Sequence, residues 1–359
     1  MDAAHPQRRA SSRVKARRRR AVPPGLRYVT DGVRGIRRKR VGGGWAYYLP
    51  NGALINDASL RQRLNRLAIP PAWTDVWICP NPDGHIQATA RDARGRKQYR
   101  YHPEYREARD RSKFRRMLEF SEVLPRLRER MERDLRSADL GRKQLLATVV
   151  QLLDRTLIRV GNDEYARDNR SYGLTTMRRR HLKIDGTTLR FSFRGKSGVE
   201  HTIAVADPRL ARIIQRCRDL PGQELFQYLD GAKRRHLVSS DDVNDYLREI
   251  SGRDVSAKDF RTWGGSMLAA VELRRRGLAA SRAETDRNIN GAIDAVAERL
   301  GNTRAVCRKY YVHPVLIEAY RMGEMIPQPA PVTRSRMRKH GAALRRDEVL
   351  VLQFLQERL

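Results

Sequence analysis

The chain has 359 residues and a formal net charge of +33, from 74 lysines and arginines against 41 aspartates and glutamates. Because such an excess of positive charge repels itself unless a polyanion neutralises it, DNA is the favoured partner. No apolar run approaches the roughly 20 residues that span a bilayer, and the cations are spread along the chain, which argues against a membrane protein. This length favours two domains over one.

The first 26 residues are basic and poor in hydrophobic side chains, which predicts a disordered arm. A solubilising tail, an electrostatic tether to DNA and a nuclear-targeting patch would all have this composition. No apolar segment follows the cations, so we expect no secretory signal. The three cysteines form no CxxC pair and no zinc-type spacing, which favours a reducing compartment, most simply the cytoplasm.

Residues 27–105 have the texture of a small, mostly β domain. Hydrophobic and polar side chains alternate in short runs, which are separated by turn residues such as those at 92–95. The predicted strands cover 45–49, 75–79, 85–90 and 97–101, and one short helix covers 59–67.

Residues 106–326 predict a larger, mainly helical domain, because apolar residues recur at three- and four-residue spacing. A small sheet interrupts the helices at 181–184, 187–193 and 199–205, and Lys196 lies in its second turn. Ser240 and Ser256 are the expected N-caps of two helices. The predicted helices cover 114–135, 143–165, 208–218, 241–250, 257–276, 283–300 and 312–322.

The last segment, 327–359, begins with a proline-rich linker at 327–331 and continues as a basic tail. Residues 349–355 within it are apolar enough to predict a docking helix. The predicted fold class is therefore α+β, with a small, mostly β N-terminal domain and a larger helical domain that contains a small sheet.

A pair of tyrosines lies among cations in the run Arg304–Pro314. A phenol with a pKa near 10 is a poor nucleophile, but neighbouring cations favour the phenolate and also attract a phosphodiester. Metal-free cleavage needs a nucleophile, cations around the non-bridging oxygens and a proton for the leaving oxygen. Since no carboxylate cluster suited to Mg²⁺ is evident, covalent attack by tyrosine is favoured over a metal-dependent nuclease.

Several short motifs follow one another in the order found in one known family. Taken singly, each is better explained as ordinary surface or core sequence, and only their joint order is specific. They are Leu157–Tyr165, Tyr172–Thr176, Phe193–Lys196, Lys258–Gly264, Gly301–Thr303 and the segment that contains Tyr311. Over roughly residues 27–322 this series resembles the type IB DNA topoisomerases, in particular the small poxvirus-like enzymes found in bacteria.

The resemblance implies a catalytic set with distinct roles. Arg159 and Arg261 match the two catalytic arginines, Lys196 matches the general acid and Tyr311 matches the nucleophile. Asn302 stands where other members have a histidine that hydrogen-bonds a phosphate oxygen. An amide can donate the same bond, but we expect no proton transfer from it.

Tyr310 is the rival nucleophile, because adjacent helical positions point about 100° apart and only one of the two can face the site. The family spacing favours Tyr311. Tyr165 and Lys258 complete the implied site as phosphate-binding residues.

The strand expected at 97–101 alternates aromatic and cationic side chains. Gln98 and Arg100 would share one face, and Lys97, Tyr99 and Tyr101 the other. A half-buried edge strand would look similar, but the run resembles the DNA-contacting element of the family and could read base edges in the major groove. The expected DNA-binding residues are Arg96, Lys97, Gln98, Tyr99, Arg100 and Tyr101.

The resemblance implies an enzyme that nicks one strand of duplex DNA through a 3′-phosphotyrosine, relaxes supercoils of both signs by strand rotation and reseals the strand. It implies no ATP, cofactor or obligatory metal, and a compact monomer whose two domains clamp DNA in a bacterial cytoplasm, associated with the nucleoid. A tyrosine recombinase shares the chemistry, but usually has His-x-x-Arg where this chain has Lys258–Arg261. A non-catalytic DNA-binding protein would explain the charge but not the ordered motifs.

Overall fold

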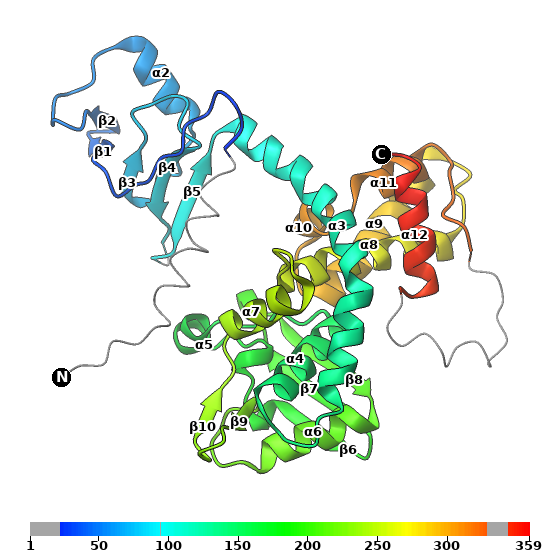
Figure 1. The fold of residues 1–359 in the computed structure, drawn as a ribbon. Coiled ribbons are helices and arrows are strands. Elements are labelled where there is room, and N and C mark those ends of the chain that lie inside the picture. The colour runs from blue at the N-terminus through cyan, green and yellow to red at the C-terminus, as the bar shows by residue number, and fades with distance from the viewer. Residues whose placement is uncertain (1–21, 94, 329–343) are drawn as a thin grey trace. The chain divides into compact units, whose positions relative to one another are not determined.

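The computed structural model describes residues 22–93, 95–328 and 344–359, which form two compact units that divide between Lys113 and Phe114. The division falls within the long helix α3 (Pro103–Leu135). The first unit is mostly β and the second is mainly helical (Figure 1), so the predicted α+β class is confirmed. Most of the expected basic arm and part of the expected proline-rich linker lie outside the described residues.

The first unit is built on an antiparallel sheet with the strand order β2-β1-β3-β4-β5 (Figure 1). Apolar residues from alternate strand positions, including Ile36, Ile78 and Ala88, pack with Leu64 of α2 into one core. The bounds are β1 (Ile36–Val41), β2 (Gly44–Tyr48), α2 (Ala58–Arg66), β3 (Thr74–Ile78), β4 (Ile86–Arg91) and β5 (Lys97–Tyr101).

Strand β1 was not predicted, because most of its residues after Ile36 are cations. Arg38 shows how the sheet accommodates them. Its guanidinium donates hydrogen bonds to the carbonyl oxygens of Ile69 (2.8 Å) and Pro70 (2.9 Å), and it lies 3.8 Å from the ring centroid of Trp45. Backbone oxygens therefore satisfy the two terminal nitrogens of Arg38, and an aromatic ring packs against its charged group.

The second unit packs helices around a small antiparallel sheet with the order β6-β7-β8. Leu189, Phe191 and Phe193 alternate with exposed residues along β7 and join the core with the almost fully buried α4. The strands are β6 (Leu182–Asp185), β7 (Thr188–Arg194), β8 (Glu200–Ala206), β9 (Gln227–Leu229) and β10 (Arg235–Leu237). The helices after α3 are α4 (Arg142–Thr156), α5 (Asp163–Asn169), α6 (Pro208–Asp219), α7 (Ser240–Ser251), α8 (Ala257–Arg276), α9 (Arg282–Leu300), α10 (Arg304–Tyr310), α11 (Pro314–Arg321) and α12 (Arg346–Gln356).

The continuous helix predicted over 143–165 is wrong beyond Thr156. Leu157 adopts the left-handed conformation (φ 59°), which ends α4, and the chain has no regular secondary structure until α5 begins at Asp163. A non-glycine residue in this region is uncommon and costs free energy. The apolar periodicity continued through the break because Ile158 and Val160 are buried on both sides of Arg159.

The expected N-cap at Ser240 is wrong by one residue. Ser239 is the cap of α7, where its hydroxyl accepts a hydrogen bond from the Asp242 backbone N–H and the Asp242 carboxylate accepts one from the Ser239 N–H. The expected cap of α8 at Ser256 is confirmed.

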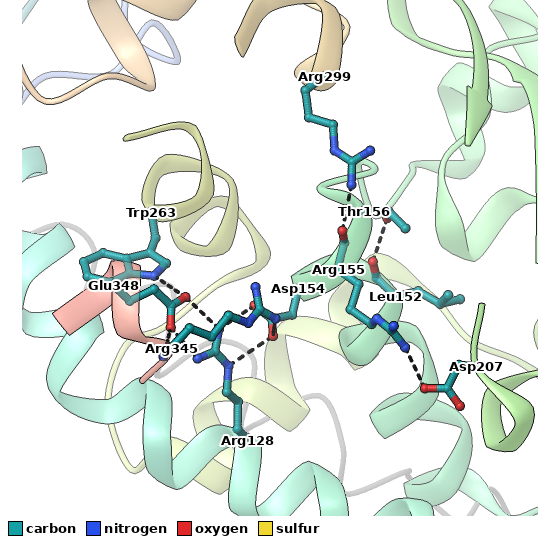
Figure 2. A network of polar contacts seen from close by, with 10 residues as sticks. All are labelled: Arg128, Leu152, Asp154, Arg155, Thr156, Asp207, Trp263, Arg299, Arg345 and Glu348. Carbon is teal, nitrogen blue, oxygen red and sulfur yellow. Dashed lines mark hydrogen bonds and ion pairs between the residues drawn. The ribbon is translucent and has the colours of Figure 1, made fainter. Parts of the chain in front are cut away.

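The docking helix predicted near the C-terminus is present as α12, which lies beside α8 (Figure 1). Its Glu348 carboxylate accepts hydrogen bonds from both terminal nitrogens of Arg128 on α3 (2.7 and 2.8 Å) and from Trp263 Nε1 on α8 (3.0 Å). Arg128 also pairs with Asp154 of α4, and these three charged side chains are only 6–7% exposed. Figure 2 shows this buried network joining α12 to three other helices.

Candidate active site

The structure brings Arg159 and Arg261 together from separate elements. Arg261 lies near the start of α8, is 5% exposed, and donates hydrogen bonds to the carbonyl oxygens of Leu157 and, at 2.9 Å, Leu300. Arg159 lies in the irregular segment between α4 and α5 and donates to the carbonyl oxygen of Gly301 at 3.2 Å. Both guanidinium groups are therefore fastened to backbone oxygens where α4 and α9 end.

The Tyr172–Thr176 motif holds the Arg159 segment in place through the backbone. Leu174 N–H donates to Arg159 O (2.8 Å), and Thr175 N–H donates to Val160 O (2.6 Å). A β-carbon at Gly173 would lie 2.5 Å from Arg159 O and 2.6 Å from the Gly161 α-carbon. Only glycine allows the two backbones to approach this closely.

Arg155, near the end of α4, makes two further polar contacts, which Figure 2 shows. Arg299, near the end of α9, donates to Arg155 O at 2.8 Å, and Arg155 pairs with Asp207 at 2.6 Å. The first contact links the ends of α4 and α9, from which Arg159 and Asn302 follow along the chain, and the second ties α4 to the N-cap of α6.

The site is electrostatically unbalanced. Burial, followed by the charge of Arg159, lowers the pKa of Arg261 to about 10, and burial also lowers the pKa of Arg159. In the described part of the chain no carboxylate forms an ion pair with either guanidinium. Two adjacent cations without a counter-ion favour binding of an anion between or beside them.

Tyr311 lies beside these cations, with its ring centroid 5.5 Å from the central carbon of the Arg261 guanidinium. It is the residue that ends α10, outside helical geometry (φ −132°, ψ −10°). Its carbonyl oxygen accepts a hydrogen bond from the Ser266 hydroxyl at 3.1 Å, and a β-carbon at Gly265 would lie 2.7 Å from the same oxygen. The backbone of Tyr311 is therefore packed directly on α8, one turn after Arg261.

Tyr310 is placed differently. It is the last helical residue of α10, and the ammonium nitrogen of Lys309 lies 5.4 Å from its ring centroid. In contrast, a negative charge on Tyr311 would raise the pKa of both Arg159 and Arg261, because it favours the charged form of each guanidinium group.

Asn302 joins the site beside Arg159, whose Nη2 donates to the Asn302 side-chain oxygen at 2.5 Å. The Asn302 Nδ2 is buried and has no hydrogen-bonding oxygen or nitrogen partner among the described residues, while the Asn302 side chain lies near the weakly accepting thiol of Cys307. Burial raises the pKa of that thiol to about 11, against the opposing effects of Arg261, Arg159 and Asn302. A buried amide donor without an oxygen partner is suited to an incoming acceptor.

Lys196 is exposed at the tip of the β7–β8 hairpin, in a single 3-10 turn that covers Lys196–Gly198. The hairpin is closed by a hydrogen bond from Gly195 N–H to Val199 O at 2.7 Å. His201 of β8 lies between this hairpin and the end of α9, because β-carbons at Gly195 and Gly301 would both collide with its ring. Lys196 therefore belongs to a turn that is packed, through one imidazole, against the turn that carries Asn302.

Sequence reasoning missed His201 and Ser266 as parts of the site. The only signal in the sequence is the glycine before Lys196 and the glycine before Asn302, and neither names its partner. The contribution of Ser266 depends on the route of the chain after α10, which no local pattern specifies.

Of the two expected phosphate-binding residues, the structure describes the side chain of only one. Lys258 is exposed in the first turn of α8, one turn before Arg261. The side chain of Tyr165, which lies in α5, is outside the described residues.

The expected DNA-binding strand is β5 of the first unit. The rings of Tyr99 and Tyr101 stack with centroids 5.8 Å apart, so these two residues share a face as expected, and Tyr99 is 44% exposed. The polar side chains of the run have partners within the unit: Arg96 and Gln98 contact Asp92, Lys97 pairs with Asp31, and Arg100 donates to Ala68 O.

In the described ranges, no helix has the length and apolar content to cross a membrane. Within the same ranges, no group of three or more His, Cys, Asp or Glu side chains is arranged to hold a metal ion.

Both units of the chain are similar to domains of known proteins. Residues 102–325 match the family model for the catalytic core of eukaryotic DNA topoisomerase I, and residues 44–92 match the N-terminal domain of bacterial DNA topoisomerase IB. DNA topoisomerase 1B of Acanthamoeba polyphaga mimivirus is 32% identical over 80% of this chain and 88% of its own length. DNA topoisomerase 1B of vaccinia virus (strain Copenhagen) is 21% identical over 63% of this chain and 70% of its own length.

Proposed function

This chain belongs to the type IB DNA topoisomerases, and on that premise we propose that it nicks one strand of duplex DNA through Tyr311, lets the nicked strand rotate, and reseals it without ATP. The observation that carries the proposal is a pair of guanidinium groups, Arg159 and Arg261, beside one tyrosine and without a carboxylate partner in the described residues. A phosphodiester would supply the missing negative charge.

The proposed reaction is an in-line displacement at phosphorus. The phenolic oxygen of Tyr311 loses its proton to solvent and forms a bond to the phosphorus, and the bond from phosphorus to the 5′ oxygen breaks. Lys196 gives a proton to that departing oxygen, which leaves as a hydroxyl. The guanidinium groups and the Asn302 Nδ2 donate hydrogen bonds to the non-bridging oxygens, whose charge grows in the transition state.

The second half of the cycle is the same step in reverse. The 3′-phosphotyrosine conserves the free energy of the phosphodiester bond, so the 5′ hydroxyl can attack it and release Tyr311 without ATP. While the ester exists, the free 5′ end can turn about the intact strand, which relaxes supercoils of either sign.

Relaxation of a supercoiled plasmid in the presence of a chelator tests this function. We expect relaxation of both positive and negative supercoils, and a covalent protein–DNA adduct when the reaction is stopped with a denaturing detergent. Exchange between two specific sites without relaxation would instead indicate a recombinase, and DNA binding without any adduct would indicate a non-catalytic protein.

We expect Lys196→Ala to slow cleavage and resealing together by about 10²–10⁴-fold, because one general acid–base group serves both directions. A substrate with sulfur in place of the bridging 5′ oxygen should restore cleavage, since a thiolate leaves without a proton. Single-turnover rates on both substrates are the measurement. Lys183→Ala, which removes an exposed lysine from β6 of the same sheet, is the matched control. Equal loss of rate on both substrates would remove Lys196 from the acid role.

The oligomeric state and the cellular location stay predictions: a monomer that closes its two domains around duplex DNA in a bacterial cytoplasm. Sedimentation of the protein with and without a short duplex checks the first. A molar mass of one chain per duplex is the expected result.

A further inference from the structure

His201 occupies a place in the site that its strand fixes. It lies on β8 directly opposite Phe193 of β7, and the two rings stack with centroids 5.0 Å apart and planes 17° from parallel. Because cross-strand register and ring stacking both hold the imidazole, it is a rigid part of the hairpin whose tip is Lys196.

Gly195 and Gly301 lie against different edges of the His201 ring. A β-carbon at Gly195 would lie 2.7 Å from the ring atoms Cδ2 and Nε2, and one at Gly301 would lie 2.3 Å from Cε1 and 2.5 Å from Nε2. Atoms of real side chains do not approach so closely, so the imidazole fills the space that side chains at both positions would need. Each glycine immediately precedes a proposed catalytic residue, Lys196 in one case and Asn302 in the other.

The two glycines are not required for the same reason. Gly301 ends α9 in the left-handed conformation (φ 57°), which favours glycine whatever surrounds it. Gly195 has an ordinary extended backbone (φ −91°, ψ −168°) that any residue can adopt. At Gly195, therefore, the close approach of the imidazole is the structural reason for glycine.

The ring also lines a small cavity together with Arg159 and Arg261. Burial, followed by the charges of these two arginines, lowers the pKa of His201 against the opposing effect of Glu200. The neutral ring therefore predominates at neutral pH, and it adds no charge to the phosphate-binding cations.

We propose that His201 is a positioning residue for DNA cleavage: its imidazole, held by Phe193 and wedged between Gly195 and Gly301, sets the distance between the Lys196 turn and the Asn302 turn. The proposal rests on the proposed function. The imidazole positions the general acid Lys196 by steric contact, and it neither gives nor takes a proton in the reaction.

The central test is His201→Ala on the two substrates that differ in the bridging atom. A misplaced general acid should slow cleavage of the normal substrate by about 10²-fold, and the 5′-thio substrate should recover most of that loss. The pH profile of cleavage should keep its shape. His236→Ala is the matched control, because His236 also stacks on an aromatic ring across a strand pair, on Tyr228 at 5.3 Å, but in the β9–β10 sheet.

Gly195→Ala provides an independent arm. Its methyl group should slow cleavage in the wild-type background because it collides with the imidazole. In the His201→Ala background the same methyl should change the rate by less than about threefold, since the collision is gone. Should His201→Ala not fold, recovery of the Gly195→Ala rate on the 5′-thio substrate tests the same idea.

Three results would overturn the proposal: no recovery on the 5′-thio substrate, independent effects of the two substitutions, or a pH profile that changes with His201→Ala. Each is distinct from failure of the proposed function, in which the wild-type protein itself would form no covalent adduct.

Discussion

Tyr311→Phe should abolish both plasmid relaxation and the covalent adduct, with a loss on the order of 10⁴-fold or more, because it removes the hydroxyl of the proposed nucleophile. Binding of duplex DNA should persist with its salt dependence unchanged, since the phenol contributes no positive charge. Adduct formation on a substrate that traps the cleaved state, followed by peptide mass spectrometry of the wild-type adduct, is the direct measurement.

Tyr310→Phe is the matched control, because it removes the same hydroxyl from the neighbouring residue. It should form the adduct at nearly the wild-type rate, as the ring beside Arg261 is that of Tyr311. An adduct that survives Tyr311→Phe and disappears with Tyr310→Phe would reverse the assignment.

Glu348→Ala should destabilise the second unit by about 3–5 kcal/mol, the usual cost of breaking a buried ion pair from one side. The carboxylate is 6% exposed and joins Arg128 to Trp263, so its removal leaves a buried cation short of a partner and an indole N–H unpaired. Burial alone would raise the pKa of Glu348, but Arg128 lowers it, so the group is charged at neutral pH. Calorimetric or urea unfolding of the second unit measures the effect.

Glu357→Ala is the control for that experiment. Glu357 is the C-cap of the same helix, but its ion pair with Arg358 is largely exposed, and we expect a change within about 0.5 kcal/mol. Equal stability of the two variants would show that α12 is not docked through Glu348 in solution.

Much of the fold could be predicted because local pattern and structure agree. The alternation along β7 and the apolar spacing of α8 each identify an element to within a residue or two. The prediction failed where tertiary contacts override pattern: at β1, where the cation Arg38 is held by distant carbonyl oxygens, and at Leu157, whose backbone turns left-handed inside an apolar run.

The candidate site was predictable only as a set of residues. Its motifs named Arg159, Lys196, Arg261, Asn302 and Tyr311, and the structure gathers four of them around shared contacts, with the Lys196 turn packed next to Asn302 through His201. The sequence did not identify His201 as part of the site, because its packing against two glycines far apart in the chain produces no periodic sequence pattern.

The packing of Tyr311 on α8 has a mechanical consequence. Gly265 and Ser266 let its backbone lie against the same helix that carries Arg261 one turn earlier. In the proposed cycle, torque from the turning duplex would reach the protein through the tyrosyl ester. The force would then act on α8, which is a packed helix, and not on a loop. Nucleophile and arginine would then be displaced together under tension, which keeps them in register for the 5′ end's return.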